Sequence, residues 1–157
     1  MKLFIDTNII LDYLEAREKG PDAKKVLKLA ESGEEYECVT ASSATDILYL
    51  FTDSLWKANK LLDEDDRKTK REIKRDALVL TNKLLGFLHI LTVTEDNIRK
   101  AFSMGWDDGE DALQYVVAKA NGVDMIITNN VRDYEQSDIP VMNAEDFLKW
   151  RSNDSSK

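Results

Sequence analysis

Five short apolar segments, separated by longer stretches with helical periodicity, constrain the fold of this chain more than any other feature. They are residues 2–6, 36–40, 89–93, 125–128 and 139–142. Strands that alternate with helices pair in parallel, because each connection returns across the sheet through a helix. We therefore expect an α/β fold: a three-layer α/β/α sandwich around a central, mostly parallel sheet of about five strands. Pro140 marks the last strand as an edge strand, since proline lacks a backbone N–H.

The stretches between these segments predict helices through their apolar spacing and their end signals. The expected helices cover roughly residues 8–14, 22–33, 44–56, 63–88, 95–104, 111–121 and 144–151. The helix over 63–88 is the longest. Its buried stripe is expected to consist of residues spaced three or four apart: Ile73, Ala77, Leu80, Leu84 and Leu88.

The composition fits one globular domain. Of 157 residues, 43% are hydrophobic and 33% are charged. We expect the domain to cover residues 1–150, followed by a polar tail at 151–157. No apolar run approaches the roughly 20 residues of a membrane helix, and Cys38 is the single cysteine, so we expect a cytoplasmic protein without membrane contact. The net charge of −8 argues against nonspecific binding to a phosphate backbone.

Acidic residues follow the first predicted strand and lie near the starts of two later helices. Asp6 ends the first strand, Asp46 falls in the first turn of the third helix, and Asp108 and Asp111 surround the start of the sixth. Parallel strands align their carboxyl ends at one edge of the sheet, so we expect these carboxylates to converge. Converged carboxylates repel one another unless a hard cation compensates. Such an ion also activates water and stabilises charge during phosphodiester cleavage.

Helix capping is the simpler account of each acid taken alone. Asp6 has the position of an N-cap residue, and Asp46, Asp108 and Asp111 lie near helix N-termini, where the helix dipole favours negative charge. Only the convergence of three separate stretches favours a functional site.

Four segments, in this order, resemble the PIN domain, the nuclease fold of VapC-type toxins. They are FIDTNIILDYL at 4–14, TASSATDILYL at 40–50, DDGEDALQYVVAKANGVDMIITNN at 107–130, and NVRDY at 130–134. The resemblance extends from residue 2 to about 148. It implies an endoribonuclease that cleaves RNA with Mg²⁺ or Mn²⁺. It also implies the toxin of a type II toxin–antitoxin pair, inhibited by a cognate antitoxin protein and commonly homodimeric.

On this resemblance, the three acids of the family fall on Asp6, Asp46 and Asp111, which we expect to be catalytic. Asp6 and Asp111 would ligate the metal ion, with Asp108 and Asn130 as further ligands. The chain departs from the family pattern at two of these positions. Asp46 is one methylene shorter than the usual glutamate, and Asn130 stands where aspartate is common.

The expected substrate-binding residues form two groups. Thr7, Asn8 and Thr128 match polar positions of the family beside the acids. Arg67 and Arg71 belong to a basic segment, residues 67–75, which could contact an RNA backbone; a solvated helix face explains them as well.

Two other functions remain open from the sequence. In one, the changes at Asp46 and Asn130 weaken catalysis, and the PIN module binds RNA or a protein partner. In the other, Asp6 accepts a phosphoryl group. Phosphotransferases of the haloacid dehalogenase type carry a second aspartate two residues later, where this chain has Asn8.

Overall fold

A five-stranded sheet forms the centre of the molecule. The structure is a computed structural model that describes residues 1–154. The strands are β1 (Lys2–Ile5), β2 (Tyr36–Thr40), β3 (His89–Leu91), β4 (Met125–Ile127) and β5 (Val141–Met142). Their order is β3-β2-β1-β4-β5, and every pairing is parallel. The expected sheet is confirmed, with β5 at an edge and β1 in the middle.

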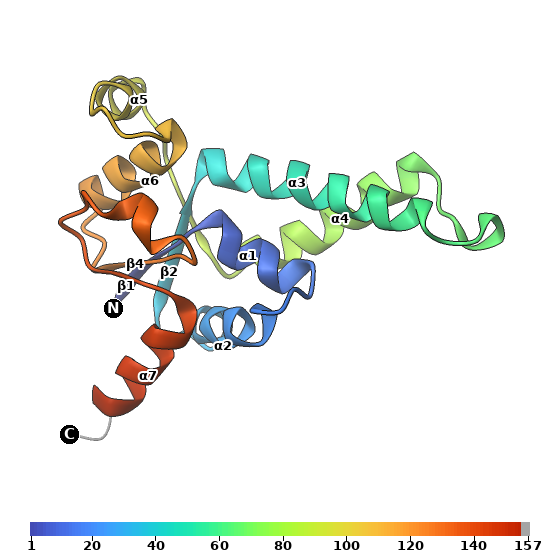
Figure 1. The fold of residues 1–157 in the computed structure, drawn as a ribbon, viewed down its shortest axis with the longest axis horizontal. Coiled ribbons are helices and arrows are strands. Elements are labelled where there is room, and N and C mark those ends of the chain that lie inside the picture. The colour runs from blue at the N-terminus through green and yellow to red at the C-terminus, as the bar shows by residue number, and fades with distance from the viewer. Residues whose placement is uncertain (155–157) are drawn as a thin grey trace.

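Helices cover both faces of this sheet (Figure 1). Within residues 1–154 they are α1 (Thr7–Leu14), α2 (Gly20–Glu31), α3 (Ala41–Lys60), α4 (Lys70–Leu85), α5 (Glu95–Phe102), α6 (Gly109–Ala120) and α7 (Ala144–Asp154). Two short 3-10 segments, η1 (Glu64–Asp66) and η2 (Val131–Tyr134), complete the connections. Helices α1, α2 and α7 pack on one face, and α5 and α6 pack on the other. No helix in the described part of the chain is long and apolar enough to cross a membrane.

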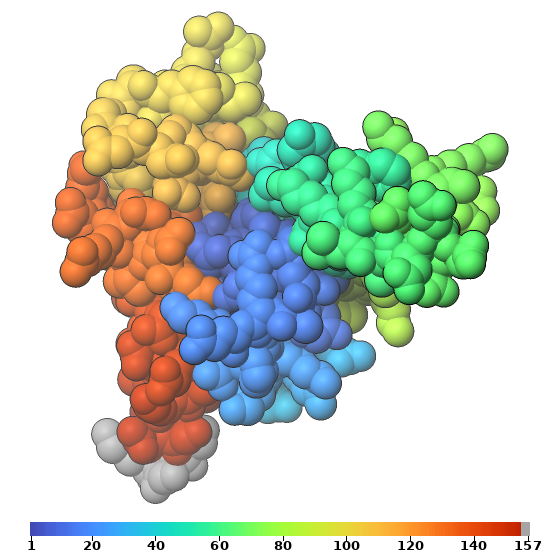
Figure 2. Space-filling view, turned by 45° about the vertical axis from the view of Figure 1, so that its right-hand side comes forward, coloured from blue at the N-terminus to red at the C-terminus, as the bar shows by residue number. Residues whose placement is uncertain are grey.

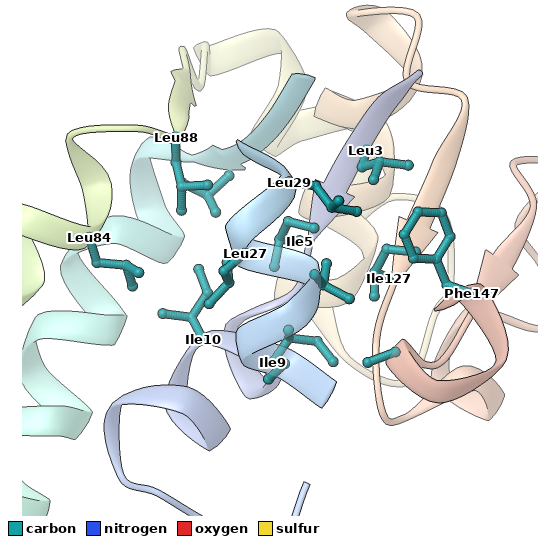
Figure 3. Packing of buried hydrophobic residues seen from close by; sticks show 14 of the residues in the cluster. Leu3, Ile5, Ile9, Ile10, Leu27, Leu29, Leu84, Leu88, Ile127 and Phe147 are labelled. Carbon is teal, nitrogen blue, oxygen red and sulfur yellow. The ribbon is translucent and has the colours of Figure 1, made fainter. Parts of the chain in front are cut away.

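The alternation of side chains along β1 divides the core into two clusters. Leu3 and Ile5 point into the first cluster, together with Leu27 of α2 and Phe147 of α7 (Figure 3). Phe4 points into the second cluster, against α6 and η2. These strand residues are 0% exposed, and each side chain of this size contributes about 1.5–3 kcal/mol when fully buried. The paired clusters hold the strand before Asp6 rigidly in place.

Helices α3 and α4 form a hairpin that projects away from the sheet (Figure 1), and we call α3, residues 61–69 and α4 the α3–α4 arm. Helix α3 starts earlier than predicted because Thr40 caps it: the Thr40 side chain accepts the Ser43 N–H at 3.0 Å. The helix also continues past the predicted end to Lys60. Helix α4 is shorter than the predicted 63–88. A capping box between Thr69 and Glu72 fixes its start, so residues 61–69 form an exposed connection.

Two further predictions need correction. Leu80 is 46% exposed, whereas Thr81 is buried. Thr81 therefore takes the place of Leu80 in the predicted buried stripe of α4. The residues predicted as a tail from 151 continue α7 as far as Asp154, and Arg151 pairs with Glu34 and Glu35. Residues 155–157 lie outside the described part.

Candidate active site

Asp6 follows β1 and has only 5% of its surface exposed. Its backbone N–H donates to the Ile127 carbonyl oxygen at 3.0 Å, which ties it to β4. Its Oδ2 accepts hydrogen bonds from Thr128 Oγ1 at 2.7 Å and Asn8 Nδ2 at 2.8 Å. The Asp6 side chain makes no N-cap hydrogen bond to α1, so capping does not account for it. Burial raises the pKa of this carboxyl, and the bonds from Thr128 and Asn8 act against the rise.

A network of amides and hydroxyls holds Asp6 in this position. Asn8 Nδ2 lies 3.1 Å from Thr128 Oγ1, and Asn8 Oδ1 accepts the backbone N–H of Asn129 at 3.0 Å. Thr128 Oγ1 accepts the backbone N–H of Asn130 at 3.0 Å. Asn8 and Thr128 thus orient the acid in this structure, and their contact with a substrate stays a prediction. Asn130 joins the network through its backbone, and its side chain is exposed.

Asp108 and Asp111 lie at the start of α6 but differ in their surroundings. Asp108 is the N-cap residue, and its Oδ1 accepts the backbone N–H groups of Glu110 at 2.8 Å and Asp111 at 3.0 Å. This cap starts α6 at Gly109, two residues before the predicted start. Asp111 is half-buried, and the Tyr134 hydroxyl lies 3.3 Å from its Oδ1. Burial, followed by the charges of Asp6 and Asp108, raises the pKa of Asp111 to about 7.

Asp46 meets an acid that the sequence prediction did not select. Because α3 begins at Ala41, Asp46 lies in the second turn rather than the first, and it is half-buried. The Glu110 side chain hydrogen-bonds Asp46, where the starts of α3 and α6 lie side by side (Figure 1). Burial, together with the bond and charge of Asp46, raises the pKa of Glu110 to about 7. In the sequence, Glu110 has the pattern of an ordinary acid in a first helical turn, so only its contact with Asp46 in the folded chain reveals it.

We call Asp6, Asp46, Asp108, Glu110 and Asp111 the acidic cluster. Among residues 1–154, no lysine or arginine forms an ion pair with any of them. No group of three or more acid, histidine or cysteine side chains in this range is arranged to hold a metal ion as it stands. The carboxylates therefore lie close enough to raise the pKa values of Glu110 and Asp111, but they do not form a ready-made coordination site.

This donor set nevertheless fits a hard divalent cation, because such ions prefer carboxylate oxygens and often keep several water ligands. Thr7 adds a buried hydroxyl with no hydrogen-bond partner beside Asp6. The site is open to solvent: Figure 2 shows the first, dark-blue part of the chain recessed between the gold α5–α6 segment and the teal start of α3.

The structure does not bring Arg67 and Arg71 to the acidic cluster. At about 1.5 Å per residue, α3 carries the chain about 20 Å from Asp46 to its last residue, Lys60. At this far end of the arm, the Arg67 guanidinium donates to the carbonyl oxygens of Leu62 at 2.8 Å and Lys60 at 3.1 Å. Arg67 thus closes the end of α3, and RNA contact by either arginine stays a prediction.

A second buried acid lies beside the network. Asp12 is 6% exposed and accepts a hydrogen bond from the Asn129 side chain, and Arg17 Nη1 lies 3.5 Å from its Oδ1. This contact could not be predicted from the sequence, because Asp12 has the spacing of an ordinary polar position in α1. It couples the first helix to the residues that follow β4.

Comparisons with known proteins agree with this architecture. The family model described as PIN domain matches residues 2–132. Ribonuclease VapC1 of Aquifex aeolicus (strain VF5) is 23% identical over 157 residues, which cover 96% of each chain.

Two solved structures share the fold. A toxin–antitoxin complex from Klebsiella pneumoniae superposes with a TM-score of 0.57 at 17% identity, over 90% of this chain and 97% of that chain. VapBC2 from Rickettsia felis, bound to a DNA fragment from their promoter, superposes with a TM-score of 0.56 at 14% identity, over 91% of this chain and 98% of that chain. At these identities the likeness shows the fold alone. Because the family model spans most of the sequence, the chain belongs to the PIN domain family.

Proposed function

We propose that this protein is a divalent-metal-dependent endoribonuclease and the toxin of a type II toxin–antitoxin pair. One observation carries the proposal: carboxylates from three separate segments converge at the carboxyl edge of the sheet, and no lysine or arginine of residues 1–154 pairs with them. An acidic cluster alone repels a polyanion, and a bound divalent cation reverses the local charge. Membership of the PIN domain family and the similarity to a ribonuclease support RNA as the substrate.

Asp6 and Asp111 would hold the Mg²⁺ or Mn²⁺ ion, with Asp46, Glu110, Asp108 and Asn130 completing its surroundings. When bound, the ion lowers the pKa of water and stabilises negative charge on the phosphate. The chain itself supplies orientation. Thr128 and Asn8 fix the Asp6 carboxylate from one side, and the Tyr134 hydroxyl contacts Asp111 from the other.

Cleavage of RNA by two variants tests the proposal. Asp6→Asn and Asp111→Asn keep the size of each side chain but remove its charge. Loss of a group that only orients a metal ligand typically costs about tenfold to a hundredfold, so loss of a ligand should lower cleavage with Mn²⁺ or Mg²⁺ by about a hundredfold or more. Asp96→Asn is the matched control, because Asp96 is exposed in the first turn of α5. Undiminished cleavage by both site variants would sink the assignment.

A PIN module that binds RNA or a protein without cutting is the second candidate. The exposed, uncharged side chain of Asn130 favours it, since this position then adds no charge to the metal site. Calorimetry with Mn²⁺ separates the two candidates. An ion-binding protein that cleaves RNA supports the nuclease, and absence of ion binding supports the inert module.

We also propose that the α3–α4 arm receives the antitoxin. A groove of about 620 Å³ runs between the two helices, lined in part by Leu48, Tyr49, Trp56, Ile73 and Leu78. Tyr49 is 73% exposed and Leu78 is 55% exposed, so the groove presents apolar surface that a partner would cover. The fold likeness to toxins solved with their antitoxins supports a protein partner.

Co-expression with the product of a short neighbouring reading frame tests this partner. Leu78→Glu should abolish co-purification, whereas Leu61→Glu, at a position outside the groove, should not. Retention of the partner by Leu78→Glu would contradict the groove assignment. By family resemblance we further propose a homodimer that acts in the cytoplasm, and light scattering of the purified protein measures its oligomeric state.

A further inference from the structure

Gln114 lies on the same face of α6 as Glu110 and Asp111, one turn further into the helix. Its side chain is buried, with 2% of the residue exposed. Its Nε2 lies 3.5 Å from Glu110 Oε1, and the same side chain lies near enough to the Asp6 carboxylate to act against the rise in its pKa. One neutral amide therefore stands between an acid from the end of β1 and an acid from the start of α6.

Tyr134 fixes which way this amide points. Its hydroxyl is buried and lies 3.1 Å from Gln114 Oε1. A phenolic hydroxyl has one proton to donate, and an amide oxygen can only accept. The same hydroxyl also lies 3.3 Å from Asp111 Oδ1, so its proton is divided between the two acceptors. With its oxygen facing Tyr134, Gln114 points its Nε2 toward Glu110. The ring of Tyr134 is itself held edge-on by Trp106, with the ring centroids 6.0 Å apart.

We infer that Gln114 is a positioning residue of the metal site, oriented by Tyr134, and that it holds Asp6 and Glu110 in place for a divalent cation. The inference rests on the proposed function and adds to it. Carboxylates that repel one another separate unless something holds them, and a neutral double donor holds them without competing for their charge. Replacement of neighbours that orient metal ligands typically weakens metal affinity by about tenfold to a hundredfold.

If Gln114 and Tyr134 served only to pack the core, their replacement would change stability but not the affinity for a cation. Gln114 and Tyr134 are both buried beside the second core cluster, so they also contribute to stability. Gln114→Met preserves the length and volume of the side chain but removes both donors. Tyr134→Phe removes a single hydroxyl. If the two residues only fill space, neither change alters the affinity of the folded protein for a cation.

The experiment is a calorimetric titration of the full-length, metal-free protein with Mn²⁺ alone. We expect Gln114→Met to raise the Kd for Mn²⁺ by about tenfold to a hundredfold, and Tyr134→Phe to raise it by a smaller factor. The double variant, compared with Gln114→Met, separates the effect of Tyr134 that passes through Gln114 from its contact with Asp111: the part through Gln114 adds nothing in the double variant. Tyr115→Phe is the matched control for Tyr134→Phe. Tyr115 follows Gln114 in α6, and its hydroxyl donates to Asp138 at 2.8 Å rather than to a member of the acidic cluster.

Cleavage assays provide a second readout. Excess Mn²⁺ should restore RNA cleavage by Gln114→Met, and the KM for RNA should stay unchanged, because a buried amide does not touch the substrate. Wild-type affinity in Gln114→Met overturns the inference while leaving the proposed function intact. If that variant does not fold, unchanged affinity in Tyr134→Phe overturns it instead. A wild-type protein that binds no Mn²⁺ overturns the proposed function and this inference together.

Discussion

Asp108 and Asp111 lie three residues apart at the start of α6, yet their carboxylates make different contacts. Asp108 accepts two backbone N–H groups, so its negative charge is already stabilised by the end of α6. Asp111 has one long contact to Tyr134 and faces the charges of Asp6 and Asp108. The pKa values of Asp111 and Glu110 are raised to about 7, so near neutral pH each is partly protonated and a bound cation would displace those protons. This difference between neighbours sets the pH dependence of the site.

We predict that the protein binds Mn²⁺ more tightly at pH 8 than at pH 6. The pKa values of Asp111 and Glu110 are both raised to about 7 in the metal-free protein, and the ion binds the deprotonated carboxylates. Below pH 7 protons compete, so the Kd should rise by about tenfold per competing group between pH 8 and pH 6. Calorimetry at the two pH values measures this change.

The same titrations in two buffers of different ionisation enthalpy measure the protons released. Release should be larger at pH 6 than at pH 8, and Asp111→Asn should reduce it. An affinity that does not change across this range would show that neither carboxylate carries a proton when the ion binds.

At the scale of elements, the α3–α4 arm shows what periodicity can and cannot predict. The spacing of Ile73, Ala77 and Leu84 predicted the buried face of α4, and these residues are buried. The start of the helix depends on the local hydrogen bonds between Thr69 and Glu72, and the acids at 63–66 gave an equally good start signal. Periodicity therefore finds a helix and its buried face, while hydrogen bonds at its ends decide where it begins.

The same limit applies to the site. Asp6, Asp46, Asp108 and Asp111 could be selected because strand ends and helix starts are visible in the sequence. Glu110, Gln114 and Tyr134 could not, because their roles depend on which face of α6 meets α3 and η2. For Asp6, the structure shows that the carboxylate accepts from the Thr128 and Asn8 side chains and makes no side-chain cap hydrogen bond at the start of α1.

Asn59 should stabilise the far end of the arm. It is 5% exposed, its Nδ2 donates to the Lys68 carbonyl oxygen at 2.9 Å, and its Oδ1 accepts the Lys68 N–H at 2.9 Å. Asn59→Ala leaves both backbone groups without their partner and should cost about 1–3 kcal/mol of unfolding free energy. Urea unfolding measures the loss, and hydrogen exchange should accelerate most at 61–69.

Asn82→Ala makes the same change on the exposed face of α4 and should have little effect. Equal stability of the two variants would show that water replaces the Asn59 bonds at no cost.

At the scale of the whole molecule, one buried acid acts on the stability of the entire fold. Glu37 stands opposite Leu3 in the pairing of β2 with β1 and is 0% exposed. Neither of its carboxyl oxygens has a hydrogen-bond partner. Its neighbour Glu35 pairs with the N-terminal ammonium and with Arg151, so the nearby cations already have partners. Burial, and then the charge of Glu35, raise the pKa of Glu37 to about 8.

We predict that Glu37→Gln stabilises the protein at neutral pH. The unfolded chain loses the Glu37 proton near pH 4.5, whereas the folded chain keeps it up to about pH 8. Folding stability from this group is therefore complete below pH 4.5 and declines as the pH rises to 8. Removing the group should add about 3 kcal/mol at pH 7 and under 1 kcal/mol at pH 5.

Thermal melts at pH 5, 7 and 8 compare this variant with Glu31→Gln, which changes an exposed glutamate of α2. A gap between Glu37→Gln and the wild type that stays constant over these pH values would exclude a proton on Glu37 as its cause.

The strand order has a consequence for the time at which the protein becomes active. β1 is synthesised first but lies in the middle of the sheet. Thr128, which donates a hydrogen bond to Asp6, lies 122 residues after Asp6 in the chain. A growing chain on the ribosome has its first acid early, but it lacks the hydroxyl and the strand that hold this acid. If the protein cleaves RNA as proposed, this order predicts that an unfinished chain does not cut the message that encodes it.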